Sequence, residues 1–541
     1  MKFTKHSENL QVDGNIQSSG SSATTISSIA FGNNTTASGN YSQAFGDGTI
    51  ASGLTSHAEG QNTIASGGQS HAEGYLSIAS GIISHAEGFG STASGNGAHA
   101  EGTATTASGG SAHAEGNTTI ASGDMSHSEG ELTVASGNWS HAEGSQTTAS
   151  GSSSHAEGQN TIAGGQSSHA EGGSTTASGD GSHAEGSQTT ASGPVSHAEG
   201  AQTTASGNAS HAEGSSTNAL GASSHSEGGI TTASGDFSHA EGSGTTASGS
   251  SSHAEGQFTT AFGESSHTEG KLTTALGLYS HAEGFGSTAG DYSHAQGNLT
   301  IADTGGHAEG SGTTAVGLYS HAEGIGSIAA ASNSHAEGYF TSAGTKAHAQ
   351  NDLTTASGFS STAMGSGSYA GGDNSLATGL LTKTDEFATN SSSFGENSLA
   401  IRENEMVLGT TQFATIGDAQ NSKTVVAGQT VGNAVLNLNV LYSLNKSYNV
   451  TCKLVGRTTN ILSPNEQSIA LNFEGLLEIG PTTSNLTLIY GQTGYGEIIG
   501  TTKQLIVDTG GLKVNISGAS GKTIRWVATF EFTEVGGIIG Y

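Results

Sequence analysis

The sequence has little of what most proteins of 541 residues use to fold and to bind ligands. Its single cysteine, Cys452, excludes a disulfide framework within one chain and a cysteine-rich zinc site. Three prolines beside 86 glycines exclude a collagen triple helix. Only 14 lysines and arginines stand against 45 aspartates and glutamates, and the resulting formal charge of −31 argues against nucleic acid as a partner.

Long apolar segments are also absent. The N-terminal sequence MKFTKHSENLQVDGN lacks the apolar core of a secretory signal, and no later run is long enough to cross a membrane. We therefore expect neither membrane insertion nor classical secretion. With these classes set aside, the internal repeat is the main guide to the fold.

The repeat is marked by histidine. Histidines recur every 14 residues from His57 to His281, and every 13 or 14 residues from His294 to His348. Two residues after each stands a glutamate, replaced by glutamine only at positions 296 and 350. Each unit splits into two halves, such as SHAEGQN and TIASGGQ at residues 56–69. Alternation over five residues, with glycine supplying a positive φ at the corner, predicts two strands and two corners, which is one coil of a β-solenoid.

The alternation also assigns side chains to the inside or the outside of the coil. Small inward side chains make a thin core that buries little apolar area at ~25 cal/mol per Å², against ~1–2 kcal/mol of backbone entropy per residue. We therefore expect an obligate oligomer. The predicted inward set is Ser56, Ala58, Thr63 and Ala65, and the predicted outward set is His57, Glu59, Ile64 and Ser66.

The ends of the repeat indicate which outer face meets a partner. The columns that hold histidine and glutamate in the middle hold large apolar residues at both ends. Because such residues are poorly suited to an exposed surface, we predict that these columns lie between subunits. The predicted interface residues are Ile29, Phe31, Phe45, His57, Glu59, His71, Glu73, His141, Glu143, Met364 and Leu376.

Two segments carry a resemblance to a known family. SIAFG at residues 28–32 and NSLAI at residues 397–401 resemble the N-S-V-A-I-G motif of YadA-like head repeats, which occur in trimeric autotransporter adhesins and in fibres of tailed bacteriophages. The resemblance spans roughly residues 25–402. It implies an all-β fold, a left-handed parallel β-roll of 14-residue coils in a homotrimer, with the V and I positions facing the trimer axis. Histidine and glutamate replace V and I through the middle of the array.

We expect four segments along the chain. They are an N-terminal attachment segment (1–25), a β-roll shaft (26–380), a transition where the 14-residue register breaks (381–412) and a C-terminal domain (413–541). Seven or more apolar runs of period two, separated by Gly, Asn, Ser and Pro turns, predict that the last segment is an antiparallel β-sandwich of the jelly-roll type.

The resemblance implies a structural fibre of a tailed phage or phage-like particle, located in the virion. The N-terminus would bind the virion baseplate, and the C-terminal domain would bind a host-surface glycan or protein. The alternative is a bacterial cell-surface or spore-surface trimeric adhesin, which would be extracellular. Adhesins of the family also carry a signal peptide, a coiled-coil stalk and a membrane anchor, and because none is visible here we favour the phage-type fibre.

A polysaccharide-degrading tailspike is a further alternative. Such an enzyme needs two carboxylates about 5 to 9.5 Å apart in a groove. A ladder of equivalent glutamates does not single out an acid and a base, so we expect no catalytic residue and no enzyme activity. The acidic residues of the C-terminal segment form no motif; they are Glu474, Glu478, Glu497, Asp508, Glu531 and Glu534.

Metal binding is the last alternative, because neutral imidazole is a common ligand of Zn²⁺ and Ni²⁺. A hydrogen-bonded His–Glu lattice between subunits is the simpler interpretation, and we expect no metal or other cofactor. In that lattice, glutamate would raise the histidine pKa above ~6.5, so the protein would be more stable near pH ~5.5 than near pH ~8.5. The histidine ladder that could bind metal instead includes His57, His71, His85, His141, His155 and His169.

Overall fold

The fold was analysed in a computed structural model that describes residues 4–6, 9–11, 16–409, 420–431, 435–440, 446–458, 468–479, 484–495, 503–508, 511–517 and 523–537. Every regular secondary-structure element in these residues is a β-strand, so the prediction of an all-β fold is confirmed for them. No helix capable of spanning a membrane occurs among them. The chain forms two compact units, Met1–Leu272 (unit 1) and Thr273–Tyr541 (unit 2).

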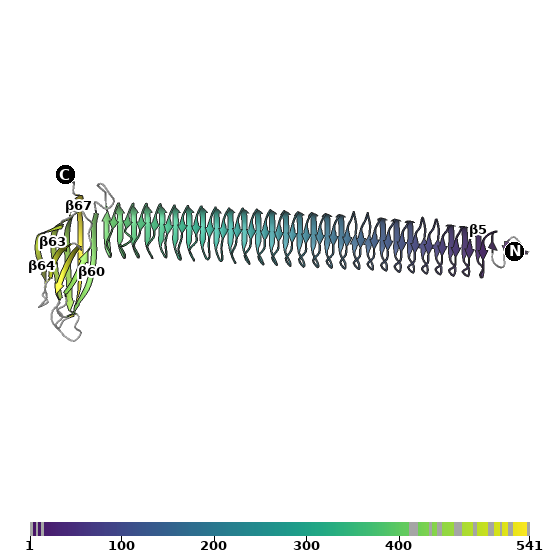
Figure 1. Ribbon diagram of the computed structural model, residues 1–541, viewed down its shortest axis with the longest axis horizontal. Helices are drawn as coiled ribbons and strands as arrows, with labels where there is room; N and C mark the ends of the chain where they lie inside the picture. The colour runs from purple at the N-terminus through teal and green to yellow at the C-terminus, as the bar shows by residue number, and fades with distance from the viewer. Residues whose placement is uncertain are drawn as a thin grey trace. The chain divides into compact units, whose positions relative to one another are not determined.

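Unit 1 is a parallel β-solenoid with two strands in each coil (Figure 1). The first sheet runs from β3 (Ile16–Gln17) through β9 (His57–Gln61) to β39 (His267–Lys271), and the second from β4 (Ser22–Ala23) to β38 (Thr260–Ala261). Each strand pairs in parallel with its equivalent one coil away, as His57 does with His71. A short antiparallel pair, β1 (Thr4–His6) and β2 (Asn9–Gln11), precedes the coils in sequence.

The interior of unit 1 is made of small side chains in straight columns. Ala58 and Ala65 are fully buried, and Ser56 is 1% exposed. The Ser56 hydroxyl donates a hydrogen bond to the carbonyl oxygen of Gly53 at 2.8 Å, which satisfies a polar group inside the core. The intervening His57 remains half-buried. The predicted assignment of inward and outward faces is therefore confirmed.

Most coils require glycine twice, for different reasons. Gly60 has a φ of 106°, and a Cβ at this position would collide with the carbonyl oxygen of Gly74 one coil later. Gly67 does not have a positive φ, yet a Cβ there would collide with the carbonyl oxygen of Gly81. The left-handed residue at this second corner is Gln69, with a φ of 60°. The expectation that glycine supplies the positive φ thus holds at Gly60, whereas Gly67 is fixed by the close approach of neighbouring backbones.

Val195 tests the strain at the second corner. It has a φ of 57° and is 68% exposed, so a β-branched residue occupies a left-handed conformation with little packing in return. Val195→Gly should raise the free energy of unfolding by about 0.5–1 kcal/mol, measured by chemical denaturation. The control is Val134→Gly in the strand β20 (Val134–Ala135), which should lower it by a similar amount. A loss of stability in both variants would contradict this account.

Unit 2 begins with the same kind of coil. Its two parallel sheets run from β40 (Thr274–Ala275) to β58 (Leu399–Ala400) and from β41 (His281–Phe285) to β59 (Glu405–Gly409). Parallel pairing links β55 (Leu376–Leu380) to β57 (Ser392–Glu396) and β57 to β59.

The coils therefore extend past both boundaries predicted from the sequence. They begin at Ile16, before the predicted start at residue 26, and continue to Gly409, past the predicted end at residue 380. One coil near the predicted end is 16 residues long, with Asn374 bonded to Asn390. The two extra residues are taken up in a turn in which the Ala388 N–H donates to the Asp385 carbonyl. This insertion shifts the register of the sequence without interrupting the sheet.

The C-terminal strands of unit 2 form two antiparallel sheets. The larger has the order β60 (Gln420–Val431), β67 (Thr523–Gly537), β62 (Lys446–Thr458), β63 (Ser468–Ile479) and β64 (Ser484–Tyr495). The smaller has the order β61 (Val435–Val440), β66 (Gly511–Ser517) and β65 (Lys503–Asp508). On β67, alternate side chains such as Trp526 and Phe530 are buried. The predicted antiparallel strands are thus present in the described residues, while their packing as a sandwich stays a prediction.

A buried ion pair stands where the parallel coils give way to the antiparallel sheet. Arg402 Nη1 lies 2.5 Å from Glu405 Oε1, with the two side chains 4% and 0% exposed. Glu405 Oε2 also accepts hydrogen bonds from the N–H groups of Ile401 at 2.8 Å and Arg402 at 3.0 Å. The guanidinium lies over the Phe532 ring, 4.7 Å from its centroid. The pair therefore ties the last coil, which ends in β59, to β67.

Removing the charge of Glu405 should loosen this junction. Glu405→Gln leaves the buried Arg402 guanidinium without a counter-charge and should lower the free energy of unfolding by about 3 kcal/mol, measured by denaturation of the full chain. The matched control is Glu531→Gln, which breaks an exposed pair with Lys423 at 3.2 Å and should cost less than ~1 kcal/mol. Equal, small effects from the two substitutions would contradict a structural role for the buried pair.

Candidate functional site

The most distinctive surface of the protein consists of two columns on the outside of unit 1. One column holds the histidines from His57 to His267, and the other holds the glutamates two residues after them; we call this surface the His–Glu face. The imidazole rings stack, as His99 and His113 do with centroids 4.8 Å apart and planes at 1°. This arrangement follows directly from the parallel register, which places each histidine beside the next.

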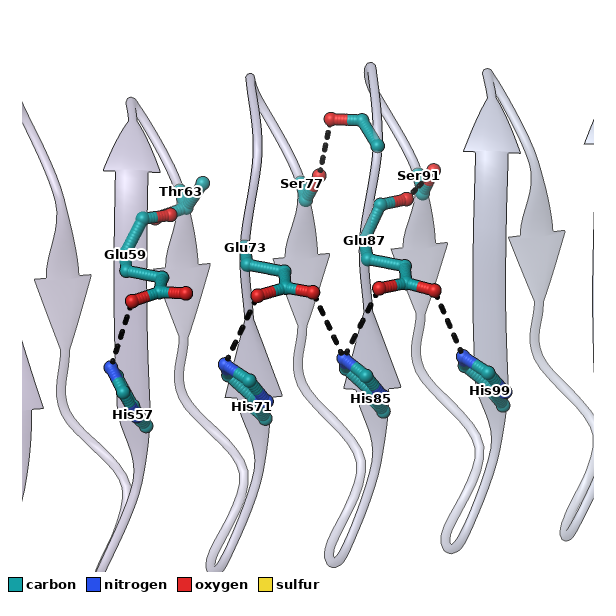
Figure 2. A network of polar contacts seen from close by, with 11 residues as sticks. His57, Glu59, Thr63, His71, Glu73, Ser77, His85, Glu87, Ser91 and His99 are labelled. Atoms are coloured by element: carbon teal, nitrogen blue, oxygen red, sulfur yellow. Dashed lines mark hydrogen bonds and ion pairs between the residues drawn. The ribbon is translucent and has the colours of Figure 1, made fainter.

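Histidine and glutamate contact each other both within a coil and between coils (Figure 2). His57 Nε2 lies 3.6 Å from Glu59 of its own coil. His85 Nε2 lies 3.9 Å from both Glu73 and Glu87, so one imidazole edge faces two carboxylates. The predicted pairing of histidine with glutamate is therefore found inside a single chain. Its extension to contacts between subunits stays a prediction.

The structure also aligns the predicted interface residues in these two columns. In unit 1, Ile29 is in register with the histidine column, and Phe31 with the glutamate column. Phe45 packs edge-on against the His57 ring at 5.6 Å. In unit 2, Met364 continues the column of Gln350, and Leu376 continues that of His348 by way of the intervening Thr362. The remaining predicted residues, His71, Glu73, His141 and Glu143, lie on the His–Glu face.

Several histidines of the His–Glu face are held towards the neutral form. Burial lowers the pKa of His85, and the neighbouring His71 and His99 lower it further, outweighing the attraction of nearby carboxylates. The same order of causes, burial first and a stacked histidine second, lowers the pKa of His113, His141 and His225. The expectation that glutamate would raise the histidine pKa is therefore wrong for these residues. A ring that gains a proton beside a protonated neighbour places two like charges next to each other, which disfavours protonation of both.

The glutamates alternate in their affinity for protons. Hydrogen bonds with the neighbouring Glu73 and Glu101 raise the pKa of Glu87 to about 7, and the hydrogen bond with Glu87 lowers the pKa of Glu101. Glu199 is likewise raised to about 7 by Glu185 and Glu213, while Glu213 is lowered. In these two stretches of the column, carboxyls of raised and lowered pKa therefore stand next to each other. The signal for this was present in the sequence, because identical glutamates one coil apart stand at strand spacing.

The sign of the histidine shift can be tested by pH. Because the folded-state pKa lies below the unfolded value of ~6.5, the unfolded chain binds more protons, and stability is lost as pH falls from ~6.5 towards the folded pKa. A variant with His85, His113 and His141 changed to Gln should therefore lose less stability than wild type between pH ~7.5 and ~5.5. The measurement is the difference in Tm at each pH, and His6→Gln, outside the ladder, should leave the dependence unchanged. A wild-type advantage that grows on acidification would restore the charged-pair hypothesis.

The glutamate column borders an open groove. One stretch of the groove, of about 950 Å³, runs along unit 1 from Phe45 to Gly130, and a second, of about 580 Å³, runs from Glu157 to Gly214. Both are lined by glutamates alternating with the glycines that follow them. The groove is therefore anionic, repetitive and open along its length. Such a surface suits small cations better than a substrate that must be held in one orientation.

Of the acidic residues considered for catalysis, Glu531 is the one whose side-chain contacts the structure describes. Glu531 on β67 lies 3.2 Å from Lys423 and 3.8 Å from Lys453, which makes it an ion-pair partner. Glu497 lies outside the described residues. The others are placed by their backbone on β63, β65 and β67: Glu474, Glu478, Asp508 and Glu534. The expectation that the protein is not an enzyme stays a prediction.

Comparison with known proteins supports the interpretation of the coils. The family model described as the YadA head domain repeat, in two copies, matches residues 23–49, 32–56, 44–70, 58–82, 128–154, 142–168, 240–266, 254–280, 308–330 and 356–381. The coils at these residues are YadA-like head repeats. The matched segments include coils that carry histidine and glutamate, such as residues 58–82 and 142–168, so the substitution at the V and I positions leaves the YadA pattern intact.

Other comparisons add little to the YadA assignment. No curated protein sequence matches the chain. Among solved structures, the tailspike protein of Acinetobacter baumannii phage AM24 is 8% identical, covering 71% of this chain and 78% of that one, with a TM-score of 0.18. A TM-score this low carries no argument about fold or function. The YadA head repeats and their His–Glu face are therefore the basis of the functional assignment.

Proposed function

We propose that the protein is a homotrimeric attachment fibre, exposed outside the cell or particle that carries it. Three chains lie side by side with their His–Glu faces turned towards the trimer axis. The N-terminal segment binds the particle, which we take to be a tailed phage or phage-like virion, and the C-terminal sheets bind a glycan or protein on the host surface. YadA head repeats are typical of trimeric adhesin-like fibres, which favours this arrangement.

The observation that carries the proposal is an apolar patch in register with the His–Glu face. Phe31 and Phe45 stack with centroids 6.5 Å apart, and Phe31 remains 45% exposed in the single chain. The interior beneath them consists of alanine, serine and threonine, which contribute little apolar burial. A second and third chain would cover these rings and add the burial that a thin solenoid needs.

The attachment role rests on the contrast between the two parts of the chain. The coils repeat the same side chains at the same positions, so they offer few distinctive pockets. The antiparallel strands after Gly409 are longer and differ in sequence from one to the next. Recognition of one host molecule requires such an irregular surface, usually carried by loops on a rigid scaffold.

The oligomeric state tests the proposed interface. Light scattering of the full chain should give three times the chain mass of 53.5 kDa, with no folded monomer on dilution. Phe31→Asp combined with Phe45→Asp should weaken the trimer, because it places charge in an apolar contact. Phe237→Asp is the matched control, since Phe237 is 66% exposed at a corner outside the two columns of the face, and it should leave the trimer intact. A folded wild-type monomer would overturn the proposal.

Antibodies against the two parts of the chain test the attachment role. An antibody against residues 413–541 should block binding of the full-length protein to host cells, and an antibody against the coils should not. In electron micrographs the first antibody should label the free ends of fibres on virions. Labelling of bacterial cells or spores instead would assign the fibre to the surface-adhesin class, and blocking by the coil antibody alone would move recognition to the shaft.

A further inference from the structure

The His–Glu face contains repeated sets of three ligand atoms of the kind that bind transition metals. In such sets, among them His127 with Glu129 and His141, the two imidazole nitrogens and the carboxylate oxygen lie within 4.8 Å of one another. Two imidazoles and one carboxylate form a common donor set for Zn²⁺ that leaves a fourth position open. The glutamates of such sets, among them Glu129 and Glu199, line the open groove, so the carboxylate side of each set faces it.

The set formed by His197, Glu199 and His211 shows the geometry most clearly. His197 Nε2 lies 3.8 Å from Glu199 Oε2, and the two rings stack with centroids 4.8 Å apart at an angle of 5°. The Nε2 atoms of His197 and His211 are both buried, and neither makes a hydrogen bond. A buried imidazole nitrogen without a hydrogen-bond partner is an unusual feature for a purely structural residue, and a metal ion would satisfy it.

The donors need a modest adjustment to reach one ion. Zinc–ligand bonds of about 2.0–2.1 Å place neighbouring donors roughly 3.3 Å apart, so the two rings must tilt towards each other. Tilted rings already occur in the repeat, since His294 and His307 of unit 2 meet at 45° and His335 and His348 at 31°. The coil therefore tolerates the rotation that a shared ion requires.

We propose that the His–Glu face is a ladder of Zn²⁺ sites, each formed by the histidines of two adjacent coils and a glutamate between them. Because each Nε2 has one lone pair, a histidine can serve one ion only. The sites therefore use coils in pairs, and the sixteen histidines from His57 to His267 hold about eight ions at saturation. The high negative charge of the chain favours cation capture. The sites lie within one chain and do not depend on the proposed trimer.

Two variants with equal numbers of substitutions separate this proposal from nonspecific binding by a histidine-rich chain. The contiguous variant keeps adjacent pairs in the second half of the ladder, and the alternating variant leaves no adjacent pair. The contiguous variant carries His→Gln at His57, His71, His85, His99, His113, His127, His141 and His155. The alternating variant carries His→Gln at His71, His99, His127, His155, His183, His211, His239 and His267.

Equilibrium dialysis of the full-length protein against Zn²⁺, followed by elemental analysis, gives the number of bound ions. The contiguous variant should lose about half of the ions held by unit 1, and the alternating variant nearly all of them. Equal losses in the two variants would mean that single histidines or histidines of different chains bind the metal, and would overturn the proposal. Glu→Gln at the intervening glutamates should weaken binding at least tenfold while leaving the histidines in place.

A measurement on the wild-type protein does not depend on how the variants fold. Zinc X-ray absorption spectra of the saturated fibre should show about two imidazole ligands per ion, with oxygen completing the shell. Three imidazoles per ion would place the site on a threefold axis between chains, and one imidazole per ion would indicate surface binding. Either result would overturn the paired-coil site.

Discussion

Parallel stacking of coils in exact register is the constraint on which the rest of this structure depends. Each residue stands next to its equivalent in the following coil, as the paired columns of His113 and His127 show. The backbones approach so closely at Gly60 and Gly67 that no side chain fits there. The columns inside the coil hold little beyond alanine, serine and threonine. The short repeat is thus a direct consequence of stacking at strand spacing.

The same constraint determines the electrostatics of the outer face. Because the coils repeat in register, the same residue type occupies the same position in successive coils. Histidine therefore lies next to histidine, and glutamate next to glutamate. At several histidines, burial and neighbouring rings both lower the pKa, as at His197. At several glutamates, hydrogen bonds to the next carboxyl change the pKa, and Glu213 raises that of Glu227 to about 7. The face therefore places hydrogen-bonded carboxyls beside imidazole nitrogens such as Nε2 of His197 and His211, which the proposed cation sites would use.

A different set of interactions stabilises the C-terminal end of the coils. Inside the stack each coil is covered by the next, but the last coil has no successor, and β59 pairs with the antiparallel strand β60 instead. The buried pair of Arg402 and Glu405 lies at this point, with Glu405 also binding two backbone N–H groups. The Arg402–Glu405 pair therefore lies where the last coil has no following coil to stack against it.

The sequence by itself determined the coil, its two faces and its strands, because a 14-residue period with small inward side chains admits few other arrangements. It also predicted the antiparallel strands after the coils from their period-two pattern. It misplaced the ends of the array, since a two-residue insertion after Gly379 hides a coil that the sheet accommodates. Only the tertiary structure decided the protonation of the His–Glu face. A pKa depends on what surrounds a group in space, and the neighbours that matter to His85 are 14 residues away in either direction.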